Sequence, residues 1–188
     1  MRHTYLVALF SVGALTACGL PATPLSNGPQ GDGGLHMKLS QFALNLPFLK
    51  EADFTSEYTG NKTVKLAGGK YENAGNKVQL QMTDQYAVGD LNGDSQMEAV
   101  VEVVAQTGGS GIFHNLVVYG EKDGKPVQLA SRLLGDRVKV KSFATNGGVI
   151  QVDLITHGPK DPLCCPTQER RLAYRMKGVH LVEVKVSQ

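Results

Sequence analysis

Alternation of apolar and polar residues recurs in short stretches through the second half of the chain. In residues 137–141 two valines alternate with three basic residues, and residues 150–154 and 172–176 repeat the pattern. Successive side chains of a β-strand point to opposite faces of a sheet, so each stretch predicts a strand with one buried face. Residues 100–104 carry valine on both faces, which is typical of a central strand.

Turn residues separate these stretches and set the expected fold. Residues 121–126, 146–148 and 177–178 are polar or rich in glycine, and the sequence contains no helical stretch long enough for βαβ crossovers. Seven to nine short strands joined in this way favour an antiparallel order. We therefore predict a mainly β fold: a single antiparallel meander curled into a twisted half-barrel or small barrel, which protects its edges.

The start of this β-rich region has a different pattern. Apolar residues at helical spacing in residues 39–46 predict one short N-terminal helix, which Pro47 is expected to end. Further on, Gly68-Gly69 stands between residues 63–67 and Lys70-Tyr71, and this arrangement predicts a hairpin with a two-glycine turn.

The most specific chemical pattern lies between two predicted strands, in residues 90–98. A loop that wraps Ca²⁺ supplies oxygen ligands from alternating residues, and this stretch has side-chain oxygens at its first, third, fifth and ninth positions. Without a cation, three carboxylates would crowd one turn. We therefore predict a Ca²⁺ site whose ligands are the side chains of Asp90, Asn92, Asp94 and Glu98 and the main-chain carbonyl of Gln96.

Two known kinds of calcium loop can be compared with this stretch. An EF-hand requires Gly at the sixth position and Glu at the twelfth, where this chain has Ser95 and Val101. The stretch instead resembles the loops of FG-GAP (integrin-type) repeats, Asp-x-Asn-x-Asp-Gly-x-x-Asp, with Ser95 replacing Gly and Glu98 replacing the last Asp. In that case Ser95 must adopt the backbone angle that the turn demands. The alternative is a plain hairpin turn, because Asn92-Gly93 between apolar runs is itself a hairpin signal.

The first residues of the chain have the pattern of a secretory signal. A basic start is followed by the mostly apolar residues 5–15, a run shorter than the roughly 20 residues that a membrane span needs. Residues 15–19 (LTACG) resemble the lipobox of bacterial lipoproteins. The resemblance implies that residues 1–17 are a signal peptide and that Cys18 is lipidated and anchors the protein to a membrane of the cell envelope, the outer membrane if the organism has one. An ordinary signal peptide with a chance cysteine is the alternative.

Cleavage before Cys18 defines the expected domains. Residues 18–34 would be the lipidated N-terminus and a flexible tether rich in Gly and Pro, and residues 35–188 a single β-rich domain. Removing 17 of the 188 residues leaves 171, with 18 Lys and Arg against 17 Asp and Glu, a net charge of +1. This balance and the absence of Trp argue against a nucleic-acid binder.

A second unusual stretch, residues 157–167 (HGPKDPLCCPT), links two predicted strands. Three prolines stiffen it, and a stiff, long loop on a sheet is a common place for function. His157 and Asp161 are therefore candidate binding residues. His157 could instead ligate a metal, although a single loop histidine is more often a surface residue that forms hydrogen bonds.

The same stretch contains Cys164 and Cys165. Neighbouring Cα atoms are about 3.8 Å apart across a trans peptide, whereas ordinary disulfides place them about 4.4–6.8 Å apart. A bond between the two would therefore be strained and reducible, yet oxidation is favoured outside the cytoplasm. We expect a vicinal disulfide. Two free thiols, intermolecular pairing and binding of a soft metal are the alternatives.

Four stretches together carry a wider resemblance. GDLNGD at 89–94, GGSG at 108–111, LGDR at 134–137 and residues 157–167 are similar to a pattern in a group of bacterial secreted proteins and lipoproteins with no assigned activity. The resemblance covers roughly residues 71–184. It implies one fold unit, and because the group has no assigned activity, no catalytic residue can be carried over from it.

Enzyme motifs are not recognisable in the sequence. Residues 108–112 (GGSGI) lack the final glycine of a Gly-x-Ser-x-Gly elbow, and the chain has neither a Gly-Lys-Ser/Thr phosphate loop nor His-Glu-x-x-His. We therefore expect a non-enzymatic, membrane-anchored domain that binds an envelope protein or ligand. The alternatives are a thiol-redox or soft-metal protein acting through Cys164-Cys165, and a hydrolase whose site is not recognisable.

Overall fold

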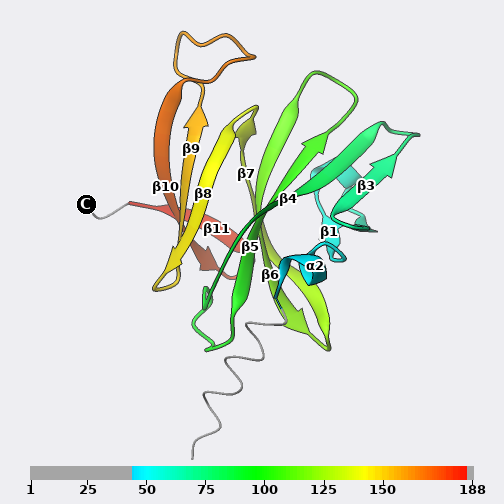
Figure 1. Ribbon diagram of the computed structural model, residues 1–188, viewed down its shortest axis with the longest axis vertical. Coiled ribbons are helices and arrows are strands. Elements are labelled where there is room, and N and C mark those ends of the chain that lie inside the picture. Colours follow the sequence, from blue (N-terminus) through cyan, green and yellow to red (C-terminus); the bar gives the residue numbers. More distant parts are fainter. Residues whose placement is uncertain (1–43, 186–188) are drawn as a thin grey trace, which may run out of the picture. The chain divides into compact units, whose positions relative to one another are not determined.

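The computed structural model describes residues 44–185, which belong to the compact unit Asp32–Gln188. The predicted signal peptide, Cys18 and the tether lie outside the described residues. No helix in the described part is long and apolar enough to cross a membrane. The elements, shown in Figure 1, are α2 (Leu46–Leu49), β1 (Asp53–Thr55), η1 (Glu57–Thr59), β2 (Thr63–Lys65), β3 (Lys70–Asn73), β4 (Val78–Gly89), β5 (Glu98–Gln106), β6 (Ile112–Lys122), β7 (Lys125–Asp136), β8 (Lys139–Asn146), β9 (Val149–Thr156), β10 (Gln168–Lys177) and β11 (His180–Val184).

Nine of these strands form one curled sheet in the order β3-β4-β5-β6-β7-β11-β10-β9-β8. At its β8 end the sheet returns to β4, where the Thr145 hydroxyl donates a 2.7 Å hydrogen bond to the Val88 carbonyl. The predicted mainly β half-barrel is confirmed. The sheet is mixed rather than a simple antiparallel meander, because β11 is inserted between β7 and β10 and pairs with β7 in parallel at Ser131–His180.

The two faces of the sheet are covered by different parts of the chain. Residues 44–66 pack on one face and form the outer core with β4, β5 and β6, while the two halves of the sheet enclose the inner core between them. Strand β5 contributes to both cores, which explains its valines on both faces. The fully buried members include Phe54, Leu66, Val101 and Val103 in the outer core, and Val100, Leu116, Ile150 and Val152 in the inner core.

The helix differs from its prediction. α2 begins at Leu46, and Pro47 lies in its first turn, where a missing N–H leaves no hydrogen bond unmade. The Asn45 side chain caps the helix by accepting a 3.0 Å hydrogen bond from the Phe48 N–H. The prediction that Pro47 ends a helix was therefore wrong. Residues 39–43 lie outside the described residues.

The two-glycine turn is present, but the strands beside it belong to different sheets. Gly68 and Gly69 both have positive φ, 58° and 79°, inside an antiparallel bridge between Ala67 and Lys70. Strand β2 pairs with β1 in a small separate sheet, whereas β3 joins the main sheet. The predicted hairpin is thus limited to its turn.

The connections lie alternately at the two ends of the sheet (Figure 1). One end carries the β4–β5 loop, which contains the predicted calcium ligands, and the β8–β9 turn. The other end carries the β5–β6 loop, the β7–β8 connection and the β9–β10 loop with its two cysteines. The two candidate sites are therefore far apart.

Candidate functional site

The acidic loop, defined here as residues 90–98, joins β4 to β5. The strands are still paired at Gly89–Glu98, so eight residues lie between these partners. Asn92-Gly93 is thus part of a longer connection between two paired strands rather than a two-residue turn.

Three side chains of the acidic loop fold it by accepting main-chain hydrogen bonds. Both carboxylate oxygens of Asp90, Oδ1 of Asn92 and Oδ1 of Asp94 are used in this way, as is common for such residues in turns. The donors are the N–H groups of Gly93 (2.7 Å) and Ser95 (3.1 Å) for Asp90, of Asp94 (2.8 Å) for Asn92, and of Gln96 (2.7 Å) for Asp94.

The fourth predicted ligand side chain, Glu98, is only 2% exposed. Its Oε2 accepts a 2.7 Å hydrogen bond from the Leu91 N–H, and its Oε1 accepts one of 3.2 Å from Nδ2 of Asn92. The same Nδ2 donates to Oδ2 of Asp94 at 2.9 Å. Two carboxylate oxygens from different residues therefore converge on one partially positive group.

The negative charge of Asp90, Asp94 and Glu98 is poorly compensated. Burial raises the pKa of the Glu98 carboxyl, the hydrogen bond from Leu91 lowers it, and the nearby charges of Asp94 and Asp90 raise it again. Within residues 44–185, none of the ion pairs involves these three acids. The ionised form of Glu98 is therefore held in an unfavourable environment.

The loop meets some requirements of a calcium site and not others. Ser95 has φ 68°, so it adopts the left-handed conformation at the position where FG-GAP loops have glycine. However, no three carboxylate, imidazole or thiol groups in the described part of the chain lie close enough together to hold a metal ion. Asp90 is directed to its own main chain, and it would have to turn to join Asp94 and Glu98.

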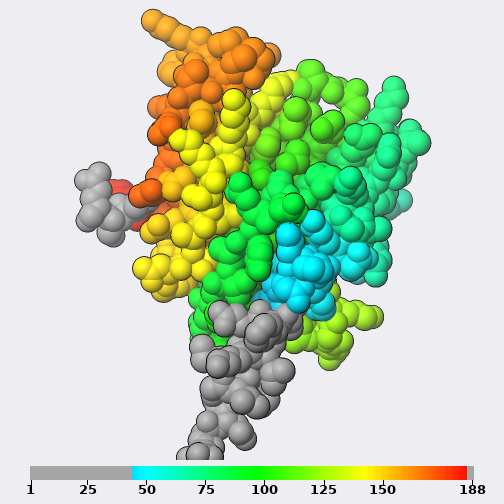
Figure 2. Space-filling model, viewed as in Figure 1, coloured from blue at the N-terminus to red at the C-terminus, as the bar shows by residue number. Residues whose placement is uncertain are grey.

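The disulfide loop, defined as residues 157–167, projects from the opposite end of the sheet, where Figure 2 shows it in orange. Cys164 and Cys165 are bonded to each other, with Cα atoms 3.8 Å apart, and the predicted vicinal disulfide is confirmed. Both cysteines are exposed, and the neighbouring Leu163 is 74% exposed. The loop thus presents a sulfur pair beside an apolar side chain.

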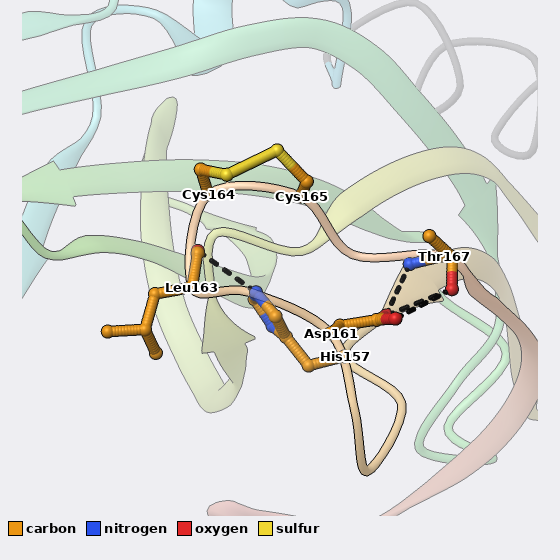
Figure 3. The surroundings of a disulfide bond; sticks show 6 residues. All are labelled: His157, Asp161, Leu163, Cys164, Cys165 and Thr167. Atoms are coloured by element: carbon orange, nitrogen blue, oxygen red, sulfur yellow. Dashed lines mark hydrogen bonds between the residues drawn. A yellow bond between two sulfur atoms is a disulfide. The ribbon is translucent and has the colours of Figure 1, made fainter.

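Asp161 ties the ends of the disulfide loop together (Figure 3). Its carboxylate accepts hydrogen bonds from the Gly158 N–H (2.8 Å) and from the N–H (2.7 Å) and hydroxyl (2.9 Å) of Thr167. These bonds, that of Gly158 first, lower the pKa of the Asp161 carboxyl because they favour its ionised form. A 3.0 Å hydrogen bond joins Nε2 of His157 to the Leu163 carbonyl, so both candidate binding residues help to shape the loop.

Sequence reasoning missed a polar pair on the inner face, formed by a buried glutamate and a half-buried histidine. Glu102, 5% exposed, lies 2.7 Å through Oε1 from Nδ1 of His114 on the adjacent strand. The available signal was a glutamate within the valine-rich central strand, since a buried charge is rarely left without a partner.

The glycine-rich residues 108–111 have a structural partner. Arg137 donates through Nη2 to the Ser110 carbonyl and through Nη1 to Asp136, at 2.6 Å in the second case. Arg137 also has a left-handed φ of 52° where the chain passes from β7 to β8. Its guanidinium group therefore links the β5–β6 loop to the β7–β8 connection, at the end of the sheet that carries the disulfide loop.

No protein-family model, curated protein or solved structure matches this chain. The resemblances to the lipobox, the FG-GAP loop and the bacterial secreted proteins therefore remain predictions.

Proposed function

We propose that this protein is a membrane-tethered, non-enzymatic binding domain of the cell envelope whose acidic loop is stabilised by Ca²⁺. The calcium part rests on one observation: oxygens of Asp94 and Glu98 converge on the same amide group of Asn92. The ligands in this proposal are the side chains of Asp90, Asn92, Asp94 and Glu98 and the carbonyl of Gln96, all oxygen donors of the kind that Ca²⁺ prefers.

The ion would supply the positive charge that the acidic loop lacks. Glu98 is buried among like charges, and a divalent cation would favour its ionised form. The direct test is elemental analysis of protein purified without chelator. About one calcium per chain supports the proposal, and protein without bound calcium that also gains none on dialysis against calcium would refute it.

The tether and its lipid are supported by residues 15–34, outside the described residues. We expect the full-length protein to partition into the detergent phase of a two-phase extraction. The Cys18→Ser variant should be released or left unprocessed. A wild-type protein that is fully soluble would refute the lipoprotein assignment.

One observation favours a second candidate function. The exposure of both cysteines makes their disulfide accessible to external thiols, so the protein could act in thiol-disulfide exchange or, when reduced, bind a soft metal. Thiol titration of the native protein separates the two functions. A structural disulfide predicts no thiol that reacts with a maleimide before reduction and two thereafter, whereas a redox or metal role predicts reactive thiols or bound soft metal in the native protein.

A further inference from the structure

Strand β3 extends the sheet beyond the point where the half-barrel closes. Closure occurs between β8 and the last part of β4, at Val88 and Thr145. The first part of β4, with β3 and the end of β5, is therefore left uncovered on the inner face. A shallow recess of about 340 Å³ lies there.

The strand register arranges the side chains of this recess as a grid. One row runs Glu72–Gln79–Gln106 across β3, β4 and β5, and the next row runs Lys70–Gln81–Val104. Strands lie about 4.8 Å apart and alternate residues about 7 Å, so the grid measures roughly 10 Å by 7 Å. Tyr71 and Leu80 also line the recess, but their side chains belong to the outer core on the opposite face.

Hydrogen bonds hold two glutamines of the grid in place, and each glutamine retains a free hydrogen-bonding group. Gln79 donates a 3.0 Å hydrogen bond to Glu72, and Gln81 donates one of 2.9 Å to the Met82 carbonyl. The amide oxygens of both glutamines remain available, as does the exposed amide of Gln106. Half-buried Val104 adds an apolar surface between them.

The chemistry of the grid selects a class of ligand. Lys70 and Glu72 cancel in charge, so the recess has no net preference for an anion or a cation. An amide both donates and accepts hydrogen bonds, and a hydroxyl group does the same. We propose that the grid binds neutral carbohydrate, one or two sugar units at a time, with Gln79, Gln81 and Gln106 bonded to hydroxyls and Val104 against the C–H face of a ring.

A larger recess on β8, β9 and β10, of about 430 Å³, is a poorer candidate. Four of the five charged side chains that line it already form pairs: Arg171 donates to Asp153 at 2.6 and 3.0 Å, and Lys141 pairs with Glu169. A ligand would have to break these pairs. The grid on β3, β4 and β5 can bind a ligand through its free amide oxygens without breaking an ion pair.

The site rests on the binding role proposed above and gives it a ligand. It lies at the opposite end of β4 and β5 from the acidic loop, so carbohydrate binding and calcium binding can fail independently. The test is a titration of isotope-labelled protein, followed by nuclear magnetic resonance, with glucose, N-acetylglucosamine and cellobiose as probes. Saturable shifts should centre on β3, β4 and the end of β5.

Substitutions then assign the site. Gln81→Ala and Gln106→Ala should each raise the dissociation constant about tenfold, since each removes one or two hydrogen bonds. Gln168→Ala, which removes an exposed glutamine at the start of β10, should leave it unchanged. All three side chains are exposed, so the variants should fold normally, and their unliganded spectra check this.

Two results would overturn the proposal. One is the lack of saturable shifts with all three sugars. The other is binding that Gln81→Ala and Gln106→Ala do not weaken relative to Gln168→Ala. In either case, a calcium-dependent rise in melting temperature would leave the proposed calcium loop intact.

Discussion

The acidic loop and the disulfide loop lie at opposite ends of one sheet, and an aspartate accepts main-chain hydrogen bonds in each. Asp161 performs this task as a single carboxylate, and its pKa is lowered by the bonds it accepts. The acidic loop uses Asp90 in a similar way but adds Asp94 and the buried Glu98, whose pKa is raised. In both loops an aspartate carboxylate therefore accepts main-chain N–H groups. The surroundings favour the ionised form of Asp161 in the disulfide loop and disfavour that of Glu98 in the acidic loop.

The difference shows which acids a loop needs in order to fold. One carboxylate that accepts two N–H groups and a hydroxyl is enough to close the disulfide loop, which also contains a covalent bond at its tip. Asp94 and Glu98 also accept N–H groups, those of Gln96 and Leu91, but each further carboxylate adds repulsion, and the burial of Glu98 adds a desolvation penalty. This repulsion is what the proposed Ca²⁺ would offset.

The largest expected effect comes from Glu98→Gln. In calcium at about 100 times the dissociation constant, the wild type should gain about 2.7 kcal/mol in free energy of unfolding over the calcium-free state. The variant should gain much less, because one ligand charge is lost. Urea denaturation with calcium and with chelator measures both gains. Equal gains in the two proteins would remove Glu98 from the site.

Without calcium, Glu98→Gln should instead stabilise the protein, and the size of this stabilisation should depend on pH. A carboxyl whose pKa is raised on folding destabilises the protein progressively as pH rises from its unfolded value, about 4.3, through its folded value. In chelator the wild type should therefore lose stability relative to Glu98→Gln as pH rises from 4 to 7. A difference between the two proteins that does not vary with pH would show that burial imposes no such penalty.

An intermediate effect is expected from Ser95→Gly. A non-glycine residue at positive φ is strained, and glycine should relieve this by about 1 kcal/mol. Ser131→Gly is the control, because Ser131 lies in β7 and glycine weakens a strand. Thermal unfolding in chelator should show opposite shifts in the two variants. Loss of stability in both would indicate that Ser95 makes a contact worth more than its strain.

A smaller effect is expected from replacing both Cys164 and Cys165 by serine. The ring closed by neighbouring cysteines is so small that it removes little entropy from the unfolded chain, and the loss should be at most about 1 kcal/mol. Any partner captured by crosslinking in intact envelopes should still be captured by the double variant. A large loss of stability, or of the partner, would move the functional site to the disulfide loop.

The smallest effect on global stability should come from Asp161→Asn, because the loop is exposed. A carboxyl whose pKa is lowered on folding contributes stability above its unfolded value, about 3.9, and the contribution is lost as pH falls through the folded value. The variant should show faster amide exchange at Gly158 and Thr167 near pH 6, a difference that disappears in acid. Unchanged exchange at both amides would show that other contacts close the loop.

Most strands of the fold were visible in the sequence because their signal is local. The alternation at residues 150–154 and 172–176 reflects one buried face, and the structure places Ile150, Val152, Leu172 and Tyr174 in the inner core. The insertion of β11 between β7 and β10 had no such signal. Its parallel pairing with β7 is limited to Ser131–His180, two residues far apart in the sequence.

The site residues divide in the same way. The neighbouring cysteines and the acidic spacing can be recognised from the sequence, since the chemistry depends on residues close together in the chain. The polar pair of Glu102 and His114 and the glutamine grid depend on strand register, which the sequence did not define. Asp161 was selected as a binding residue, and the structure shows it closing the loop through Gly158 and Thr167.

The calcium loop is the central claim, and its most direct test is the melting of chelator-treated wild-type protein with and without added Ca²⁺. A ligand that binds only the folded state stabilises it by mass action, so the melting temperature should rise with calcium concentration and saturate. Magnesium should give a smaller rise, because it dehydrates reluctantly and demands stricter geometry. Identical melting curves in calcium and in chelator would contradict the account.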